Sequence, residues 1–371
     1  MRILITTSPG IGHILPLIPT AWALRAAGHD VLFAAPSNTD KVASAGLPAI
    51  DPAPGFDFRA VFTEFIATEQ ARRPSAGEQG LDFVAKLFAT VSAPSVDEIV
   101  RLATDWTPDL IIGGPVEGAG GVAAALLDVP AVVHGIGPGQ DPALTEALAA
   151  QMTEAYQRFG VSSRPAAAFL DISPPSLRAP GLAGIAMRYV PFNGGGVLEP
   201  WLTTPRTRRR ITVTLGTVVP MMGGVGALAR LAGAAGEVDA EFVLALGGAD
   251  PAPLGALPAN VRVVDWVPLN ALLAVSDAVV HHGGAGTVMT SFAAGIPQLV
   301  LPQGADQFFN AEMVAKSGAG EVLGAADLNA ARLTDLLTDI SKRSAATKIV
   351  DELAGQPSPA DVVPELVALA N

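Results

Sequence analysis

The hydrophobic positions of the chain form short apolar runs that alternate with helical patterns. Arg2 to Thr7 is an apolar, β-branched run of the kind found in buried parallel strands. After a loop rich in proline and glycine, a helical pattern extends from about Leu15 to Ala27 and ends at the next glycine. A second apolar run, Asp30 to Ala35, follows. This order of strand, helix and strand predicts a βαβ unit.

The same unit recurs in both halves of the chain. Further strands are predicted at 108–112, 131–133, 211–215, 241–246, 261–264, 277–280 and 299–301, with helices at 120–127, at 227–235 and after 287. Between the halves, prolines, the glycine triplet Gly194 to Gly196 and the arginine cluster Arg206 to Arg210 are typical of a linker. Residues 56–80 show little periodicity, and we expect a mobile loop beside the cleft.

These elements predict an α/β fold of two Rossmann-like, doubly wound parallel-sheet domains that face each other across a cleft. The length of 371 residues is sufficient for two hydrophobic cores. We expect an N-terminal domain over residues 1–190, a linker over 191–210 and a C-terminal domain over 211–371. The last helix could pack back on the N-terminal domain.

Composition argues against several classes of function. Half of the residues are hydrophobic, which indicates a folded globular chain. The net charge of -12 argues against nucleic acid as a partner, because proteins that bind the phosphate backbone usually present a basic face. The absence of cysteine excludes disulfides and cysteine-ligated metals. Residues 278–305 lack charged side chains, but their glycines and prolines argue against a membrane span, so we expect a cytoplasmic protein.

The most informative motif is His281-His282-Gly283-Gly284-Ala285-Gly286-Thr287, between a predicted strand and a predicted helix. Glycines at such a turn let backbone N–H groups approach an anion, and the start of the helix adds partial positive charge. His282 and Thr287 can donate further hydrogen bonds. We therefore favour pyrophosphate binding over the alternative, an ordinary glycine-rich turn with Thr287 as a helix cap.

His13 follows the first strand, at the edge of the sheet where α/β folds bind ligands. It is either a general base or a structural loop histidine. The adjoining Gly10-Ile11-Gly12 does not make a dinucleotide-binding motif, because Leu15 stands where the third glycine would be. Weaker candidates are Trp266, which suits a core or a stacked base, and Asp306-Gln307, which suits a helix cap or sugar hydroxyls.

These residues make the chain similar to the GT-B glycosyltransferases that attach deoxysugars to bacterial natural products. The resemblance covers nearly the whole chain. Its most specific part is the nucleotide-sugar signature from Trp266-Val267-Pro268, through residues 282–287 and 295–297, to Asp306-Gln307. Residues 174–177 and 188–194 are similar to the interdomain region of polyketide glycosyltransferases.

The resemblance implies an acceptor-binding N-terminal domain and a C-terminal domain that binds the nucleotide sugar. It implies inverting, metal-independent transfer of a (deoxy)sugar from a dTDP-sugar to a hydrophobic polyketide-type aglycone. No cofactor is expected, and a homodimer stays open. His13 would take the proton of the acceptor, Trp266 and Val267 would hold the nucleobase, and Asp306 and Gln307 would contact sugar hydroxyls. The pyrophosphate would be held by Gly216, Thr217, His282, Gly284, Ala285, Gly286 and Thr287.

Two positions depart from what many relatives have. An aspartate that orients the histidine usually follows the strand ending near Ile112, but here Gly113 and Gly114 stand there and Glu117 is the nearest carboxylate. Glu117 is therefore the candidate support of His13. Relatives that use UDP-sugars typically carry a ribose-binding glutamate three positions after the Ser/Thr of the glycine turn. Thr290 replaces it here, which predicts a preference for dTDP-linked donors, because a carboxylate facing a 2-deoxyribose would lose a partner.

Two other kinds of protein remain as alternatives. A sugar-nucleotide epimerase of the same fold would turn over the donor without an acceptor, whereas a non-catalytic nucleotide-sugar-binding homologue would bind the donor without transfer. The sequence identifies neither the aglycone nor the sugar.

Overall fold

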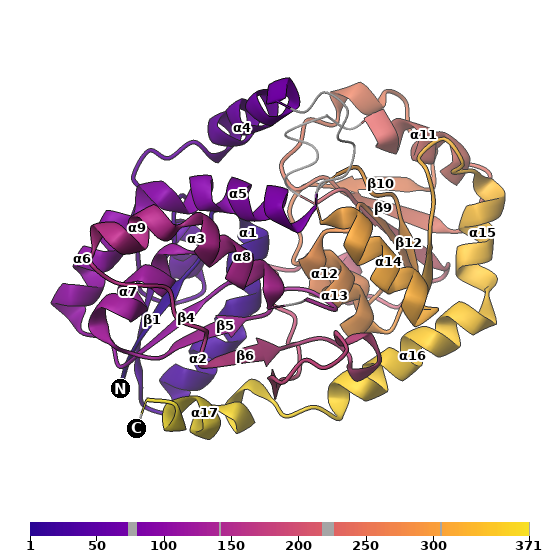
Figure 1. Cartoon of the computed structure of the whole chain (residues 1–371). Helices are drawn as coiled ribbons and strands as arrows, with labels where there is room; N and C mark the ends of the chain where they lie inside the picture. The colour runs from indigo at the N-terminus through magenta and orange to yellow at the C-terminus, as the bar shows by residue number, and fades with distance from the viewer. Residues whose placement is uncertain (73–79, 141, 217–225, 305, 371) are drawn as a thin grey trace.

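The structure, a computed structural model of the chain, describes residues 1–72, 80–140, 142–216, 226–304 and 306–370. It contains two parallel sheets, each covered by helices on both faces (Figure 1). The order in the first sheet is β3 (Ala49–Ile50), β2 (Asp30–Ala34), β1 (Arg2–Thr6), β4 (Leu110–Gly113), β5 (Ala131–His134), β6 (Ala168–Asp171) and β7 (Ile185–Ala186). The order in the second is β10 (Val261–Val264), β9 (Glu241–Ala245), β8 (Arg210–Thr214), β11 (Ala278–His281), β12 (Gln298–Val300) and β13 (Gly320–Val322). The predicted pair of doubly wound α/β domains is confirmed.

Helices occupy most of the connections between strands. Those of the first domain are α1 (Ile11–Ile14), η1 (Leu15–Leu17), α2 (Ile18–Ala26), α3 (Thr39–Ser44), α4 (Phe58–Arg72), α5 (Leu81–Ser92), η2 (Ala93–Ser95), α6 (Val96–Trp106), α7 (Ala119–Leu127), α8 (Ala143–Gln151), α9 (Thr153–Arg158) and η3 (Pro175–Leu177). After the linker helix η4 (Pro200–Leu202) come α11 (Gly226–Ala235), η5 (Ala252–Leu254), α12 (Leu269–Leu273), α13 (Ala285–Ala294), α14 (Gln307–Ser317), α15 (Ala330–Thr338), α16 (Ile340–Ala354) and α17 (Pro359–Ala368).

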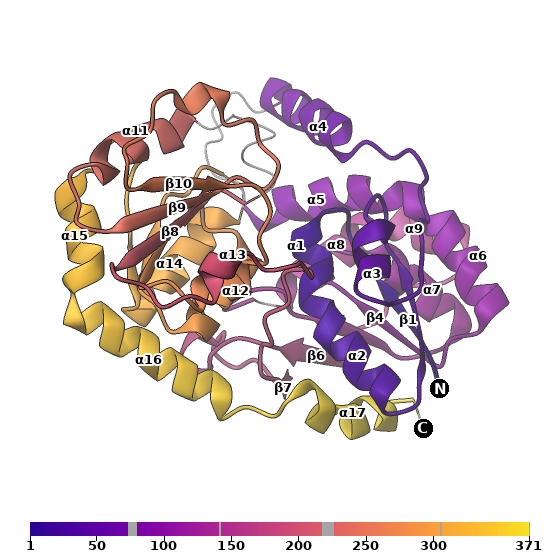
Figure 2. The ribbon, with the colours of Figure 1, turned by 180° about the vertical axis from the view of Figure 1, so that it is seen from behind.

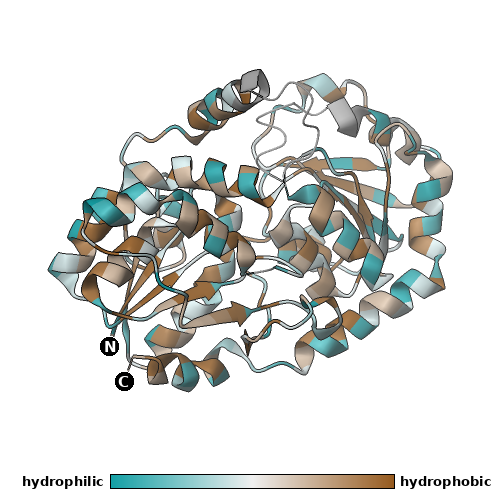
Figure 3. Cartoon of the chain, in the orientation of Figure 1, coloured by the Kyte–Doolittle hydropathy of each residue, from teal (hydrophilic) through white to brown (hydrophobic). Residues whose placement is uncertain are grey.

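The central strands are buried on both faces, as their apolar sequences predict. In β1, Ile3 and Ile5 belong to one hydrophobic cluster and Leu4, which points the other way, belongs to another. The strands of the first sheet are accordingly coloured mostly hydrophobic in Figure 3. None of the described helices is long and apolar enough to cross a membrane.

The first predicted helix is divided into η1 and α2, and a further helical turn, α1, precedes it where a loop was predicted. Pro16 falls within η1 and Pro19 in the first turn of α2. Each proline lacks an amide donor, so the backbone cannot continue one hydrogen-bonded ladder through this region. As a result, the segment that carries His13 is a separate turn of helix between β1 and α2.

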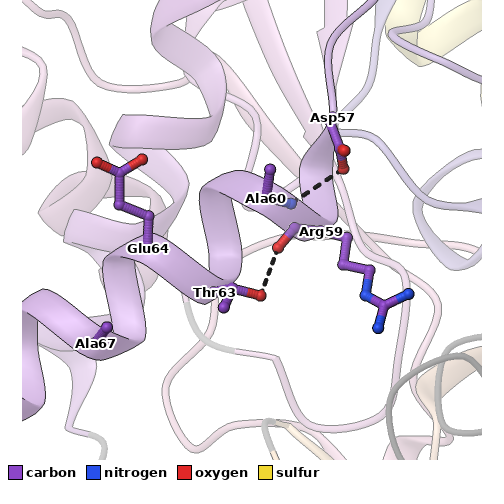
Figure 4. A pocket seen from close by; sticks show the side chains of 6 residues that line it. All are labelled: Asp57, Arg59, Ala60, Thr63, Glu64 and Ala67. Carbon is purple, nitrogen blue, oxygen red and sulfur yellow. Dashed lines mark hydrogen bonds between the residues drawn. The ribbon is translucent and has the colours of Figure 1, made fainter.

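The prediction of a loop over residues 56–80 is wrong for residues 58–72, which form α4. Asp57 Oδ1 accepts a hydrogen bond from the Ala60 amide at 3.0 Å and so caps the start of this helix (Figure 4). Phe65 of α4 packs edge-on against Phe83 of α5, with ring centroids 5.3 Å apart. A shallow surface pocket of about 540 Å³ runs along α4, and none of the predicted site residues lines it. Residues 73–79 lie outside the described residues.

The C-terminal segment links the two domains. Helix α16 covers the second domain, and the chain then returns to the first, so that both termini lie close together (Figures 1 and 2). Helix α17 packs against α2, and Val362, Val363 and Leu366 join the cluster that holds Ile18 and Leu24. The Arg188 amide also donates a hydrogen bond of 2.7 Å to the carbonyl of Pro357.

Candidate active site

The turn between β11 and α13 leaves the first N–H groups of α13 without a side-chain cap. Gly283 adopts φ 94°, a conformation that side chains disfavour, and Gly284 precedes the helix without any side-chain cap. A Cβ atom placed on Gly286 would have no atom within 4 Å, so the first turn of α13 borders open space. Uncapped N–H groups and the positive end of a helix favour an anion here.

His281 holds this turn in shape. Its Nδ1 accepts a hydrogen bond from the Gly283 amide at 3.1 Å, and its Nε2 lies 2.9 Å from Oε1 of Gln298. Together the two contacts place the proton on Nε2. Burial and the neighbouring His282 lower the pKa of His281 to about 3, so the ring is neutral at pH 7. Sequence reasoning gave His281 no separate role, because the predicted strand ended at residue 280, whereas β11 extends to His281 in the structure.

The position of the His282 ring explains why residues 216 and 284 are glycines. A Cβ atom on Gly216 would lie 2.6 Å from Cε1 of the ring, and one on Gly284 would lie 2.4 Å from Nε2. Only glycine therefore leaves room for the imidazole between the ends of β8 and β11. His282 is 7% exposed, and its buried Nδ1 lacks a hydrogen-bond partner in the described part of the chain. Burial lowers its pKa to about 4. Thr217, the next residue of the predicted pyrophosphate site, lies outside the described residues.

The predicted sugar-binding pair lies beside the same turn. The backbone oxygen of Gln307 would be 2.9 Å from a Cβ atom on Gly283, so the starts of α13 and α14 are adjacent. Asn310 connects them, because its Nδ2 donates to the carbonyl of Gly283 at 2.9 Å and to Oδ2 of Asp306 at 2.8 Å. Asn310 was missed by sequence reasoning. Its only signal was its position one helical turn after Asp306.

Trp266, the predicted partner of the nucleobase, presents an exposed aromatic ring. It follows β10, and its side chain is 44% exposed. Gly194 of the linker lies along the edge of the ring, and Nζ of Lys41 from the first domain is 5.8 Å from the ring centroid. Val267, by contrast, packs its side chain into a small cluster with Leu202 and Val264. An exposed tryptophan ring fits a stacked nucleobase. The partly buried Val267 side chain packs against the protein, and its contact with the base stays a prediction.

His13 lies on α1 at the carboxyl end of β1. Its ring packs edge-on against Phe88 of α5, with centroids 5.7 Å apart. Nδ1 is buried and has no hydrogen-bond partner among the residues the structure describes. Burial lowers the pKa of His13 to about 4, so the ring is neutral and able to accept a proton at pH 7.

Glu117 has a different role from the predicted support of His13. Its Oε2 accepts hydrogen bonds from Thr6 Oγ1 at 2.5 Å and from the Gly120 amide at 3.0 Å, and its Oε1 accepts from the Ala119 amide at 2.7 Å. Both oxygens are thus committed to β1 and to the first turn of α7. A Cβ atom at Gly120 would lie 2.8 Å from Oε2, so the glycine admits the carboxylate.

Thr290 does not lie where a ribose could reach it. The side chain is 1% exposed, and its hydroxyl donates to the carbonyl of Gly286 at 2.7 Å. The same oxygen lies 3.1 Å from the hydroxyl of Tyr189 and 3.3 Å from Nδ2 of Asn193. The predicted contact of Thr290 with the nucleotide is therefore wrong, because linker residues cover this side of α13.

The two domains meet next to the glycine turn. A Cβ atom on Gly137, in the loop after β5, would lie 2.8 Å from Cβ of Ala285, the first residue of α13. Both views of the ribbon place α1 and α13 on the facing sides of the two domains (Figures 1 and 2). Within the described ranges, no group of three His, Asp or Glu side chains is arranged to hold a metal ion.

Comparisons with known proteins identify the family. The models of the N- and C-terminal domains of the erythromycin biosynthesis protein CIII-like family match residues 22–216 and 229–369. The elloramycin glycosyltransferase ElmGT of Streptomyces olivaceus is 39% identical over 99% of this chain and 97% of its own length. The crystal structure of the glycosyltransferase SnogD from Streptomyces nogalater, 42% identical, matches 100% of this chain and 99% of that chain with a TM-score of 0.87.

A further relative has been solved in complex with ligands. The spinosyn rhamnosyltransferase SpnG in complex with thymidine diphosphate is 31% identical, with a TM-score of 0.83 over 99% of this chain and 100% of that chain. The same enzyme has also been solved with spinosyn aglycone. The chain belongs to the erythromycin biosynthesis protein CIII-like family and is a GT-B glycosyltransferase of the bacterial natural-product type.

Proposed function

We propose that this enzyme transfers a (deoxy)sugar from a dTDP-sugar to a polyketide-type aglycone, with inversion at the anomeric carbon and without a metal or cofactor. The observation that carries the proposal is the uncapped start of α13, beside which the ring of His282 is buried between Gly216 and Gly284. Inversion, metal independence and the dTDP-sugar donor are taken from the family resemblance. We also propose that the enzyme works in the cytoplasm.

In the proposed complex the diphosphate lies against the first turn of α13. The N–H groups of this turn and the His282 ring donate hydrogen bonds to its oxygens, which stabilises the negative charge that grows as the leaving group departs. The base stacks on Trp266, and the sugar hydroxyls lie near Asp306 and Gln307. Hydrogen bonds with His281 and Asn310 hold the turn before the substrate binds, so the helix start needs little reorganisation during the reaction.

The transfer itself is a single displacement. The acceptor hydroxyl attacks the anomeric carbon from the face opposite the diphosphate, the new carbon–oxygen bond forms, and the bond from the anomeric carbon to the phosphate oxygen breaks. His13 takes the hydroxyl proton, and the nucleoside diphosphate leaves with the electron pair. His13 then returns its proton to solvent. A general base in this position contributes about 10²–10⁴ in rate.

The decisive experiment is to incubate the enzyme with several dTDP-sugars and a panel of polyketide aglycones, with EDTA present, and to detect glycosides by mass spectrometry. The anomeric configuration of a product is then compared with that of the donor by NMR. Release of dTDP only in the presence of aglycone supports transfer. A donor converted to its epimer without an aglycone identifies an epimerase, and tight donor binding without any product identifies a binding protein. Either result contradicts the proposal.

A further inference from the structure

The linker between the domains contacts two elements that carry predicted donor-site residues, the Trp266 loop and helix α13. Gly194, at φ 82°, lies along the ring edge of Trp266, and a Cβ atom on Gly196 would be 3.2 Å from Cδ of Pro268. Tyr189, just before the linker, and Asn193, within it, hydrogen-bond to Thr290 of α13. This stretch, residues 189–196, therefore bridges the loop that carries the tryptophan and the helix that begins at the glycine turn.

Asn193 is the centre of the bridge. Its Oδ1 accepts a hydrogen bond from the Asn270 amide at 3.0 Å and so satisfies an N–H group at the start of α12, which follows the Trp266 loop directly. Its Nδ2 donates to Oγ1 of Thr290 at 3.3 Å. One side chain thus connects the start of α12 to the second turn of α13.

Thr290 completes the connection towards the anion site. Its O–H donates to the carbonyl of Gly286, so Tyr189 and Asn193 act as the donors to its oxygen. A hydroxyl has one hydrogen and two acceptor positions, and all three are in use here. Tyr189 and Thr290 are buried, so the removal of one partner leaves another polar group without a hydrogen bond.

We propose that Tyr189, Asn193 and Thr290 are positioning residues that set the distance between the nucleobase platform at Trp266 and the diphosphate turn of α13. The inference rests on the proposed function. A ligand that spans two subsites binds better than its fragments only when the spacing between the subsites matches its own length. A shift of the tryptophan loop relative to α13 would lower the affinity for the whole nucleotide and leave each subsite able to bind its own fragment.

The test compares dTDP with two fragments, thymidine and inorganic pyrophosphate. Ligand-observed NMR on the full chain measures all three dissociation constants, because it is sensitive to weak binding. In Asn193→Ala we expect the affinity for dTDP to fall about tenfold, while the two fragments change by less than about twofold. Thr290→Val and Tyr189→Phe should give the same pattern, and Thr290→Ser, which keeps the hydroxyl, should restore the binding of dTDP.

Asn329→Ala provides the matched control. Asn329 caps α15, where its side chain accepts a hydrogen bond from the Arg332 amide, and the predicted site does not include it. This variant should lower the melting temperature and leave all three affinities unchanged. If Asn193→Ala weakens dTDP and its fragments equally, or weakens none of them, the positioning role is wrong. A wild-type enzyme that binds no dTDP contradicts the proposed function as well, so the two failures are distinguishable.

Discussion

Thr6 Oγ1 donates a hydrogen bond of 2.5 Å to Oε2 of Glu117, and this contact joins β1 to the start of α7. The carboxylate that the sequence suggested as support of His13 is therefore committed elsewhere. His13 is left as a partly buried imidazole whose buried Nδ1 has no hydrogen-bond partner in the described part of the chain. Two predictions follow from this separation, one for each residue.

Replacement of His13 by alanine should reduce turnover by about 10²–10⁴ and leave the affinity for dTDP unchanged. A base must be neutral to accept a proton, and burial lowers the pKa of His13 to about 4. The wild-type kcat/KM should therefore reach its plateau by about pH 5 and fall at lower pH. A plateau that begins only near pH 7 would indicate a carboxylate partner. His29→Ala, outside the proposed site, serves as the control.

Glu117→Gln should change stability and leave the pH profile unaltered. The amide keeps the shape of the side chain, but its NH₂ group cannot accept both the Thr6 hydroxyl and the α7 amides. We expect a loss of about 1–2 kcal/mol in the free energy of unfolding, measured by urea denaturation. A variant with native stability and an acid limb of kcat/KM displaced towards lower pH would show that Glu117 acts on His13 after all.

Gly286→Ala should separate binding from stability. The added Cβ atom meets nothing within 4 Å in the protein, and alanine favours a helix over glycine by about 0.5–1 kcal/mol, so the melting temperature should rise. The same methyl group would occupy the space in which the diphosphate is expected, so the affinity for dTDP should fall at least about tenfold. Calorimetry measures both quantities.

Gly233→Ala is the matched control for this variant. Gly233 lies within α11, and a Cβ atom there also meets nothing within 4 Å. It should show a similar gain in stability and no change in the binding of dTDP. Unchanged binding in Gly286→Ala as well would place the diphosphate away from α13.

The sequence was sufficient for the architecture because buried parallel strands carry continuous apolar runs, and glycines and prolines separate them. The sequence also located the glycine turn, since a predicted strand followed by His282 and three nearby glycines is typical of an anion-binding turn. Helix α4 was missed although Phe58, Phe62 and Phe65 recur at the helical spacing i, i+4, i+7, because few large apolar residues follow residue 66 and the pattern covers little more than two turns.

The errors at Glu117 and Thr290 have a common physical origin. Both assignments used the position of a residue in the chain as a measure of where its side chain lies. The partners that decide its direction are distant in sequence: Thr6 is 111 residues from Glu117, and Tyr189 is 101 residues from Thr290. Hydrogen bonds of this kind depend on tertiary packing, which local patterns do not encode.

The enzyme should lose stability as the pH falls below about 6.5. Burial is the main cause that lowers the pKa values of His13, His134 and His282 to about 4 and of His281 to about 3, against an ordinary value of 6.5. The unfolded chain therefore binds protons that the folded chain excludes between about pH 4 and 6.5. The stabilisation is complete above 6.5 and is lost as the pH falls towards the folded-state pKa values.

Proton uptake on unfolding measures this directly. Calorimetry at pH 5 in buffers of different ionisation enthalpy should show net uptake by the wild-type protein, and about one proton less for His134→Gln. Burial raises the pKa of Glu117, so this group releases a proton on unfolding and lowers the net uptake. The difference in uptake between the wild type and His134→Gln removes this contribution. Equal uptake in both would mean that His134 is protonated in the folded state.

Thr290→Glu tests whether residue 290 sets the preference between dTDP and UDP. A ribose-facing residue would, on substitution by glutamate, shift the preference from dTDP towards UDP. In the structure the carboxylate would instead be buried against Tyr189 and Asn193, without a positive partner among the residues that contact Thr290 there. We expect the free energy of unfolding to fall by at least about 2 kcal/mol, because a larger, charged group is forced into a filled site. Competition binding should show weaker affinity for both dTDP and UDP, with their ratio unchanged.

Thr290→Ser, which retains the hydroxyl, should resemble the wild type in both measurements. A stable Thr290→Glu enzyme that prefers UDP would place residue 290 at the ribose and would contradict its role in the linker network.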